Sequence, residues 1–287
     1  MSVLLDLILE PLGYAFMVRA LAAALMVGVV SAVIGAYMVL RGMAFFGDAL
    51  AHAILPGVAI GYLVGGGARE PLFWGALVAA LLSSLGIGAV SKMTRLREDT
   101  AIGIVFAGMF ALGIALISSV RNYSLDLAHF LFGDVLGVSS RDLILIAVLG
   151  GVVLLAVVLL YKEFLVLSFD PLLAATLRLP DRLLEYLLLV LIALTIVVSL
   201  QTVGVALMVA MLITPAAAAY LLTRRLPFMM ALAVVIACIA GVIGLYLSYY
   251  VRISSGAAIV LTCTALFLLC WALRAVRKML AERQSQR

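Results

Sequence analysis

Long, unbroken apolar runs are the feature that most restricts how this chain can fold. Each run comes close to the roughly 20 residues that an α-helix needs to cross a bilayer core. The runs are continuous rather than alternating, which favours helices over the strands of a membrane β-barrel. They cover residues 14–40, 43–66, 71–93, 100–120, 142–161, 183–199, 203–223, 226–250 and 256–274. We therefore predict an all-α polytopic membrane protein with about 8–9 transmembrane helices, in which residues 1–287 form a single transmembrane domain.

The composition supports the same class. Hydrophobic residues make up 67% of the chain and charged residues 11%, against about 45–50% and about 25% in soluble domains. The mean hydropathy is +1.32. Such a chain has almost no residues left for a water-soluble domain, which excludes a cytosolic enzyme, a secreted domain and a nucleic-acid-binding protein. We expect a multi-pass protein of the cytoplasmic membrane, in contact with lipid and not with nucleic acid.

The distribution of Lys and Arg predicts the orientation in the membrane. The formal net charge is +5, and basic residues are concentrated in the cytoplasmic loops of membrane proteins. Given the nine runs, all but five of the 19 Lys and Arg residues fall on one side. The exceptions are Arg19, Arg69, Arg121, Arg141 and Arg252. The side with the majority, which includes the C-terminus, is therefore placed in the cytoplasm, and nine spans then put the N-terminus outside.

Two ionisable side chains interrupt the second apolar run. Asp48 and His52 are spaced i, i+4, so a helix places them on one face. At 1.5 Å per residue, His52 lies about 14 Å in from residue 43, close to the middle of a core about 30 Å thick. A carboxylate at that depth costs at least about 2.5–3.5 kcal/mol and usually marks a transport pathway. Pro56 and Gly57 follow directly and are expected to break the helix, which is tolerated at this depth only beside a cavity.

Asp48 and neutral His52 form a ligand set suited to a divalent transition metal such as Zn, Mn or Fe. The alternative is a mutual hydrogen bond that simply satisfies both groups. Two ligands are too few for a complete shell, so a second copy of the chain, other side chains, carbonyls or water must supply the rest. His129, the other histidine, forms an i, i+3 pair with Asp126. That pair could mark the point where metal enters, although a packed or solvated loop histidine fits better.

Two segments are too short to cross the membrane. Residues 124–139 are expected to lie at the interface or re-enter the membrane on the outer side. Residues 163–182 form a cytoplasmic segment in which Asp170 is a good N-cap, Pro171 suits the first helical position and Pro180 stops the helix. The resulting short helix is either a docking element for another protein or an ordinary interfacial helix.

Catalytic motifs are missing from the sequence. The chain has no GxxxxGK[ST], no HExxH and no GxSxG pattern, which argues against ATP hydrolysis by a P-loop, a metalloprotease and a serine hydrolase. We therefore predict a transport protein rather than an enzyme, with no permanently bound cofactor.

Several ordered motifs together resemble the permease subunits of the zinc/manganese/iron ABC importers, the metal ABC-3 family. The most specific is a phenylalanine-rich FFGDxLxHxxLPG pattern within residues 43–63. The resemblance extends over about residues 14–272. The further motifs, in the order of the family, lie at residues 97–114, 131–139, 169–179, 203–219 and 244–261.

The resemblance implies an ABC importer permease fold and a homodimer that moves divalent Mn, Zn or Fe. A cytoplasmic ABC ATPase would hydrolyse ATP, and an extracytoplasmic metal-binding protein would deliver the ion. By similarity, Asp48 and His52 hold metal in the translocation path. The residues implied in coupling to the ATPase are Asp170, Pro171, Ala174, Ala175 and Leu177.

The chain departs from the family pattern at two places. Arg178 stands where the coupling segment usually carries Gly, and Arg252 and Ser254 stand where an Asp and a Pro are more usual. The functional alternative is a stand-alone secondary transporter driven by proton exchange at Asp48 or His52. An intramembrane enzyme is a third alternative, which the sequence supports least because it shows no set of catalytic residues.

Overall fold

The computed structural model describes residues 9–66, 68–94, 96–118, 135–169, 174 and 176–285, and all of its regular elements in these ranges are helices. Nine helices of the described part, counting α3 and α4 as one span, are long and apolar enough to cross a membrane. The predicted all-α fold and the upper predicted span count are confirmed. The elements are α2 (Ala15–Arg41), α3 (Phe46–Ala53), α4 (Leu55–Gly65), α5 (Arg69–Thr94), α6 (Glu98–Ser118), η1 (Val135–Gly137), α8 (Ser140–Leu159), α9 (Tyr161–Phe169), α11 (Asp181–Val203), α12 (Val205–Leu222), α13 (Leu226–Val251) and α14 (Ser255–Ser285).

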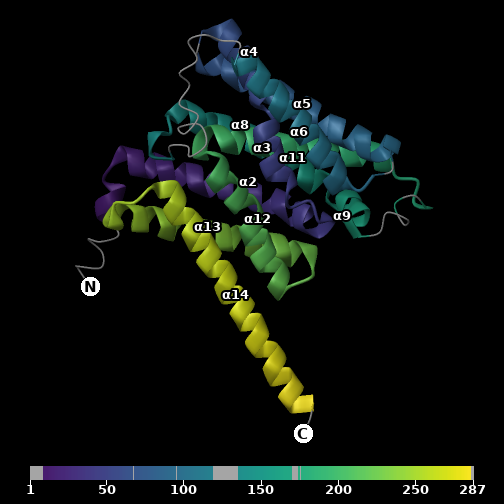
Figure 1. Ribbon diagram of the computed structural model, residues 1–287. Helices are drawn as coiled ribbons and strands as arrows, with labels where there is room; N and C mark the ends of the chain where they lie inside the picture. Colours follow the sequence, from purple (N-terminus) through teal and green to yellow (C-terminus); the bar gives the residue numbers. More distant parts are fainter. Residues whose placement is uncertain are drawn as a thin grey trace.

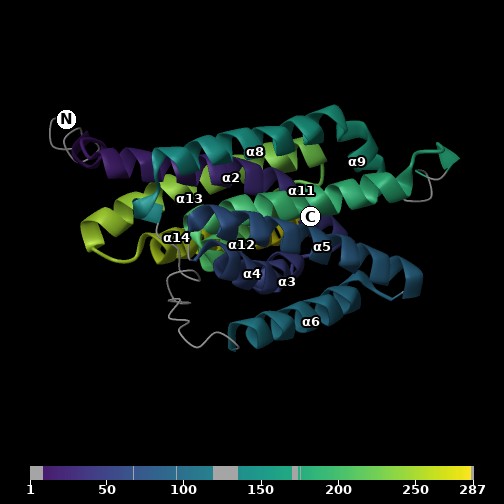
Figure 2. The same ribbon diagram turned by 90° about the horizontal axis from the view of Figure 1, so that it is seen from above.

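The helices form a bundle around α2, which packs against α8, α11, α12 and α13 (Figure 1). Seen from above, α6 and α8 lie at opposite edges of the bundle (Figure 2). The far end of α14 extends beyond the other helices (Figure 1), and its residues 271–279 are all exposed. The centre is tightly filled, with Tyr37, Met38, Phe46 and Leu50 completely buried.

The second span is broken into two helices. α3 ends at Ala53 and α4 begins at Leu55, with Pro56 in the first turn of α4. Proline lacks the N–H that would continue the ladder of α3, and it is tolerated at the start of a new helix. The break expected next to Asp48 and His52 is therefore present.

Glycines bring α4 and α5 into direct backbone contact. A Cβ on Gly57 would collide with the carbonyl oxygen of Gly75, and a Cβ on Gly75 would collide with that of Gly57. Such contacts between small residues hold membrane helices together where lipid gives no hydrophobic driving force. The α4–α5 pair therefore behaves as one packed unit beside α3.

The segment expected in the cytoplasm departs from the prediction at its start. The sequence predicts a helix only from Asp170 onward, but a further helix, α9, begins at Tyr161. Its Phe164 is fully buried and meets the Tyr37 ring edge-on, with ring centroids 5.7 Å apart. Burial of this ring against Tyr37 thus holds α9 against α2. Of the segment 124–139, only residues 135–139 are described, and Asp126 and His129 lie outside the described residues.

Substitution of Gly75 by alanine should destabilise the α4–α5 contact by about 1–3 kcal/mol, the usual cost of overpacking. Gly86→Ala on the same helix is the control, because nothing lies within 4 Å of the place that a Cβ on Gly86 would take; that change should be neutral or stabilising by up to about 1 kcal/mol. Thermal unfolding of the detergent-solubilised protein measures both. Equal melting temperatures for the two variants would contradict the proposed packing.

Candidate functional site

Asp48 and His52 lie on the same face of α3, as their spacing predicts. The Asp48 Oδ1 to His52 Nε2 distance is 3.7 Å, which is too long for a hydrogen bond. The side chains are 42% and 28% exposed respectively. The mutual hydrogen bond considered as an alternative is therefore not formed, and both groups keep lone pairs free for a ligand.

The turn between α2 and α3 sets the direction in which the Asp48/His52 face of α3 points. α2 ends in a Schellman motif, in which the Met43 N–H donates to the Met38 carbonyl at 2.9 Å and Gly42 takes a left-handed conformation with φ +73°. Met43 and the α3 residues Phe46 and Leu50 are buried. Their burial fixes the rotation of α3 and leaves Asp48 and His52 on the side that is half open.

Two phenylalanines of α6, Phe106 and Phe110, pack against His52 and form what we call the aromatic wall. The ring of His52 meets Phe110 edge-on at 5.7 Å and Phe106 at 6.1 Å between centroids, and the two phenylalanines stack at 5.7 Å. Phe45 packs edge-on against Phe106 from the start of α3. Sequence reasoning did not single out Phe106 and Phe110, although their i, i+4 spacing in an apolar run was the available signal.

The open face needs a covering in the membrane. Only 17% of the most apolar part of α6 is buried, against 67% for α2, so the Asp48/His52 face opens beside the most exposed span. Contact with hydrocarbon is costly for these groups, and ionisable residues at such depth face a bundle interior or a water-filled cavity. Within the described residues no group of three or more His, Cys, Asp or Glu could hold a metal ion. A full ligand shell around Asp48 and His52 therefore needs groups beyond the described His, Cys, Asp and Glu of a single copy.

The predicted coupling segment is only partly described. Asp170, Pro171 and Ala175 lie outside the described residues, whereas Ala174 is buried and Leu177 is 55% exposed. The expected N-cap at Asp170 thus stays a prediction.

The end of this segment is a second Schellman motif. The Leu179 N–H donates to the Ala174 carbonyl at 3.1 Å, and Arg178 occupies the left-handed position with φ +54°. Glycine is the usual residue at such a position because it has no Cβ to clash, so the side chain of Arg178 is held there under strain. Arg252, the second departure, likewise has a positive φ of +60° at the end of α13.

Comparison with known proteins finds similar membrane transport proteins. The model of the ABC 3 transport family matches residues 13–274. The chain is 46% identical over 260 residues to the manganese transport system membrane protein MntC of Halalkalibacterium halodurans, covering 91% of this chain and 88% of that protein. It is 41% identical over 261 residues to the chelated iron transport system membrane protein YfeD of Yersinia pestis, covering 91% and 86%.

A solved structure has the same fold. The chain matches a chain in the structure of PsaBC from Streptococcus pneumoniae in complex with Fab with a TM-score of 0.79 and 38% sequence identity. The match covers 93% of this chain and 95% of that chain.

Replacing Arg178 by glycine should stabilise the protein by about 1 kcal/mol, because a left-handed residue with a side chain is strained there. Arg274→Gly is the matched control: Arg274 is exposed within helix α14, where the same change should cost about 1 kcal/mol. Chemical unfolding in detergent measures both. A loss of stability in Arg178→Gly would show that another Arg178 interaction outweighs the strain.

Proposed function

The chain belongs to the ABC 3 transport family, and on that premise we propose that it is the membrane permease of an ATP-driven importer of Mn, Zn or Fe as the divalent ion. The observation that carries the proposal is the pair Asp48 and His52, held within 3.7 Å of each other on a half-open face inside a span. A carboxylate and an imidazole attract a divalent cation and bind it through oxygen and nitrogen.

The incomplete shell favours a homodimer. The half-open Asp48/His52 face and the poorly buried α6 beside it would be covered by a second copy, which would bring its own Asp48 and His52. Two such pairs supply four ligands, the number that a bound zinc ion typically takes from its surroundings. The path would then lie between the two permeases.

ATP would be hydrolysed by a separate cytoplasmic subunit, and an extracytoplasmic metal-binding protein would deliver the ion. The coupling segment supports a cytoplasmic docking contact, with Leu177 exposed next to a firmly closed helix end at Arg178 and Leu179. We propose Asp170, Pro171, Ala174, Ala175 and Leu177 as the coupling residues. No permanently bound cofactor is required, because the metal is the cargo.

The alternative, a stand-alone transporter driven by protons, predicts a different result in liposomes. A stand-alone transporter would move metal in liposomes under a pH gradient with no second subunit. Membership of the ABC 3 transport family favours the ATP-driven mechanism. Reconstitution of the chain with and without its ATPase distinguishes the two.

Asp48→Ala or His52→Ala should lower ATP-dependent uptake of radiolabelled Mn²⁺ by at least about 100-fold, more than the 10–100-fold loss typical of a group behind the ligands. Assembly with the ATPase should be unchanged, as measured by co-purification. Glu163→Gln, a carboxylate change on α9, should retain uptake. Uptake at the wild-type rate in the double variant would refute the site.

Phe110→Ala should weaken Mn²⁺ binding by about threefold to tenfold, because the edge-on contact that orients His52 is worth about 0.5–1.5 kcal/mol. Calorimetric titration of the solubilised permease gives the dissociation constant. Phe228→Ala is the control, since this ring is 63% exposed on α13. An unchanged constant in Phe110→Ala would show that the aromatic wall does not position His52.

A further inference from the structure

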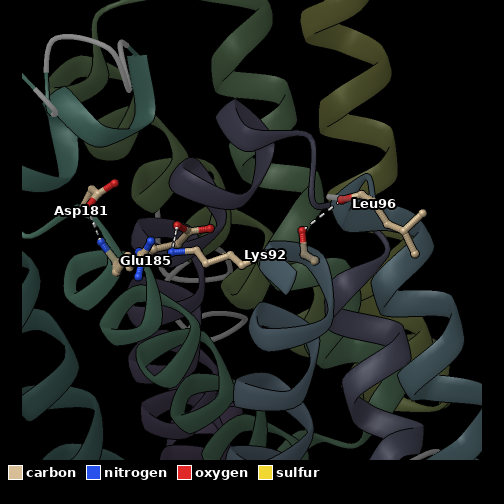
Figure 3. A network of polar contacts seen from close by, with 6 residues as sticks. Lys92, Leu96, Asp181 and Glu185 are labelled. Atoms are coloured by element: carbon tan, nitrogen blue, oxygen red, sulfur yellow. Dashed lines mark hydrogen bonds and ion pairs between the residues drawn. The ribbon is translucent and has the colours of Figure 1, made fainter. Parts of the chain in front are cut away.

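An ion pair joins α5 to α11 at the end of the bundle assigned to the cytoplasm. The Lys92 Nζ lies 2.5 Å from the Glu185 Oε2, and the two side chains are only 27% and 21% exposed. Figure 3 shows the pair between the two helices. Charge-assisted contacts of this length are strong, and removing one partner of a shielded pair leaves the other charge uncompensated.

Residues next to the ion pair also hold α5 and α11 close together. Lys92 also lies 5.1 Å from the centre of the Tyr186 ring, within the range of a cation–π contact. One turn earlier on α5, a Cβ on Gly88 would lie 2.8 Å from the same ring. The ion pair, the ring and the glycine therefore form one close contact, which we name the α5–α11 clamp (Lys92, Glu185, Tyr186 and Gly88).

The α11 side of the clamp begins directly after the coupling segment. Pro180 precedes Asp181, the first residue of α11, and the Asp181 carboxylate accepts a hydrogen bond from the Arg182 N–H at 2.8 Å. Glu185 is one turn further along. A displacement of the segment that ends at Arg178 and Leu179 therefore reaches Glu185 through about one helical turn.

The α5 side of the clamp leads to the metal pair. The Ser91 hydroxyl, next to Lys92, donates to the Leu96 carbonyl at 3.2 Å, as drawn in Figure 3. This bond ties the last turn of α5 to the residues just before α6 begins at Glu98. Two to three turns further, α6 carries Phe106 and Phe110 against the ring of His52.

Further charges gather at the same end. Glu98 is half-buried and interacts electrostatically with Arg41, Lys92, Glu185 and Asp99. Arg41 ends α2, directly before the turn into α3. Charges at the ends of α2 and α5 and at the starts of α6 and α11 are thus close enough to interact.

We propose that Lys92 and Glu185 are positioning residues that transmit the movement of the coupling segment to α6 and so to the metal pair. The inference rests on the proposed function, because it presumes an ATPase at the coupling segment. The route runs from α11 across the ion pair to α5, through the Ser91–Leu96 bond to α6, and through Phe106 and Phe110 to His52. In this role the pair acts neither as a metal ligand nor as part of the docking surface, but as the link between the two.

The test measures Mn²⁺ uptake and phosphate release together in proteoliposomes that contain the full permease and its ATPase. Glu185→Gln and Lys92→Met should each hydrolyse ATP and bind Mn²⁺ as the wild type does, but import at least about fivefold less Mn²⁺ per ATP, the lower end of typical coupling factors. The charge swap Lys92→Glu with Glu185→Lys should recover most of that ratio. Lys162→Met, which removes an exposed cytoplasmic cation on α9, should keep it.

A wild-type ratio in both single variants would overturn the inference, and so would a swap that stays as uncoupled as the single variants. Loss of folding or of ATPase assembly in both single variants, measured by thermal unfolding and co-purification, would assign the pair a structural role and overturn it as well. Failure of the proposed function looks different: the wild-type complex itself would then show no ATP-dependent uptake.

Discussion

Hydration of one carboxylate is the constraint on which the rest of this structure depends. A charged group inside a bilayer is tolerated only where protein, water or a counter-ion replaces the water that it has lost. Asp48 lies inside a span and is 42% exposed, so its surroundings must supply that replacement. The half-open face and the helix break beside it leave room for such a replacement.

The remaining helices differ in how closely they pack against their neighbours. The glycine contact between Gly57 and Gly75 holds α4 and α5 together at backbone distance, and α2 is buried throughout most of its length. By contrast, α3 is short and α6 is mostly exposed. The candidate metal pair thus lies on a short, closely packed helix, α3, beside the weakly buried α6.

Much of this organisation could be predicted from the sequence, because the bilayer makes long apolar runs and rare charges decisive. The nine spans and the helix break before Pro56 follow from such local rules. The helix α9 did not, since burial of Phe164 against Tyr37 is a tertiary contact that no local pattern shows. The clamp partners Lys92 and Glu185 are far apart in the sequence, and no periodicity pairs residues at such a distance. For Arg178 the sequence showed a departure, and only the positive φ gave its physical reason.

The break between α3 and α4 has a consequence for the helix that carries Asp48 and His52. α3 has 8 residues, a length of about 12 Å, which is less than half of a hydrocarbon core about 30 Å thick. Six of these residues are buried, and α3 contacts α5, α6, α11 and α12, so the break shortens this helix without loosening its packing. In a permease built in this way, a cation would meet a site whose backbone is already in place before it arrives.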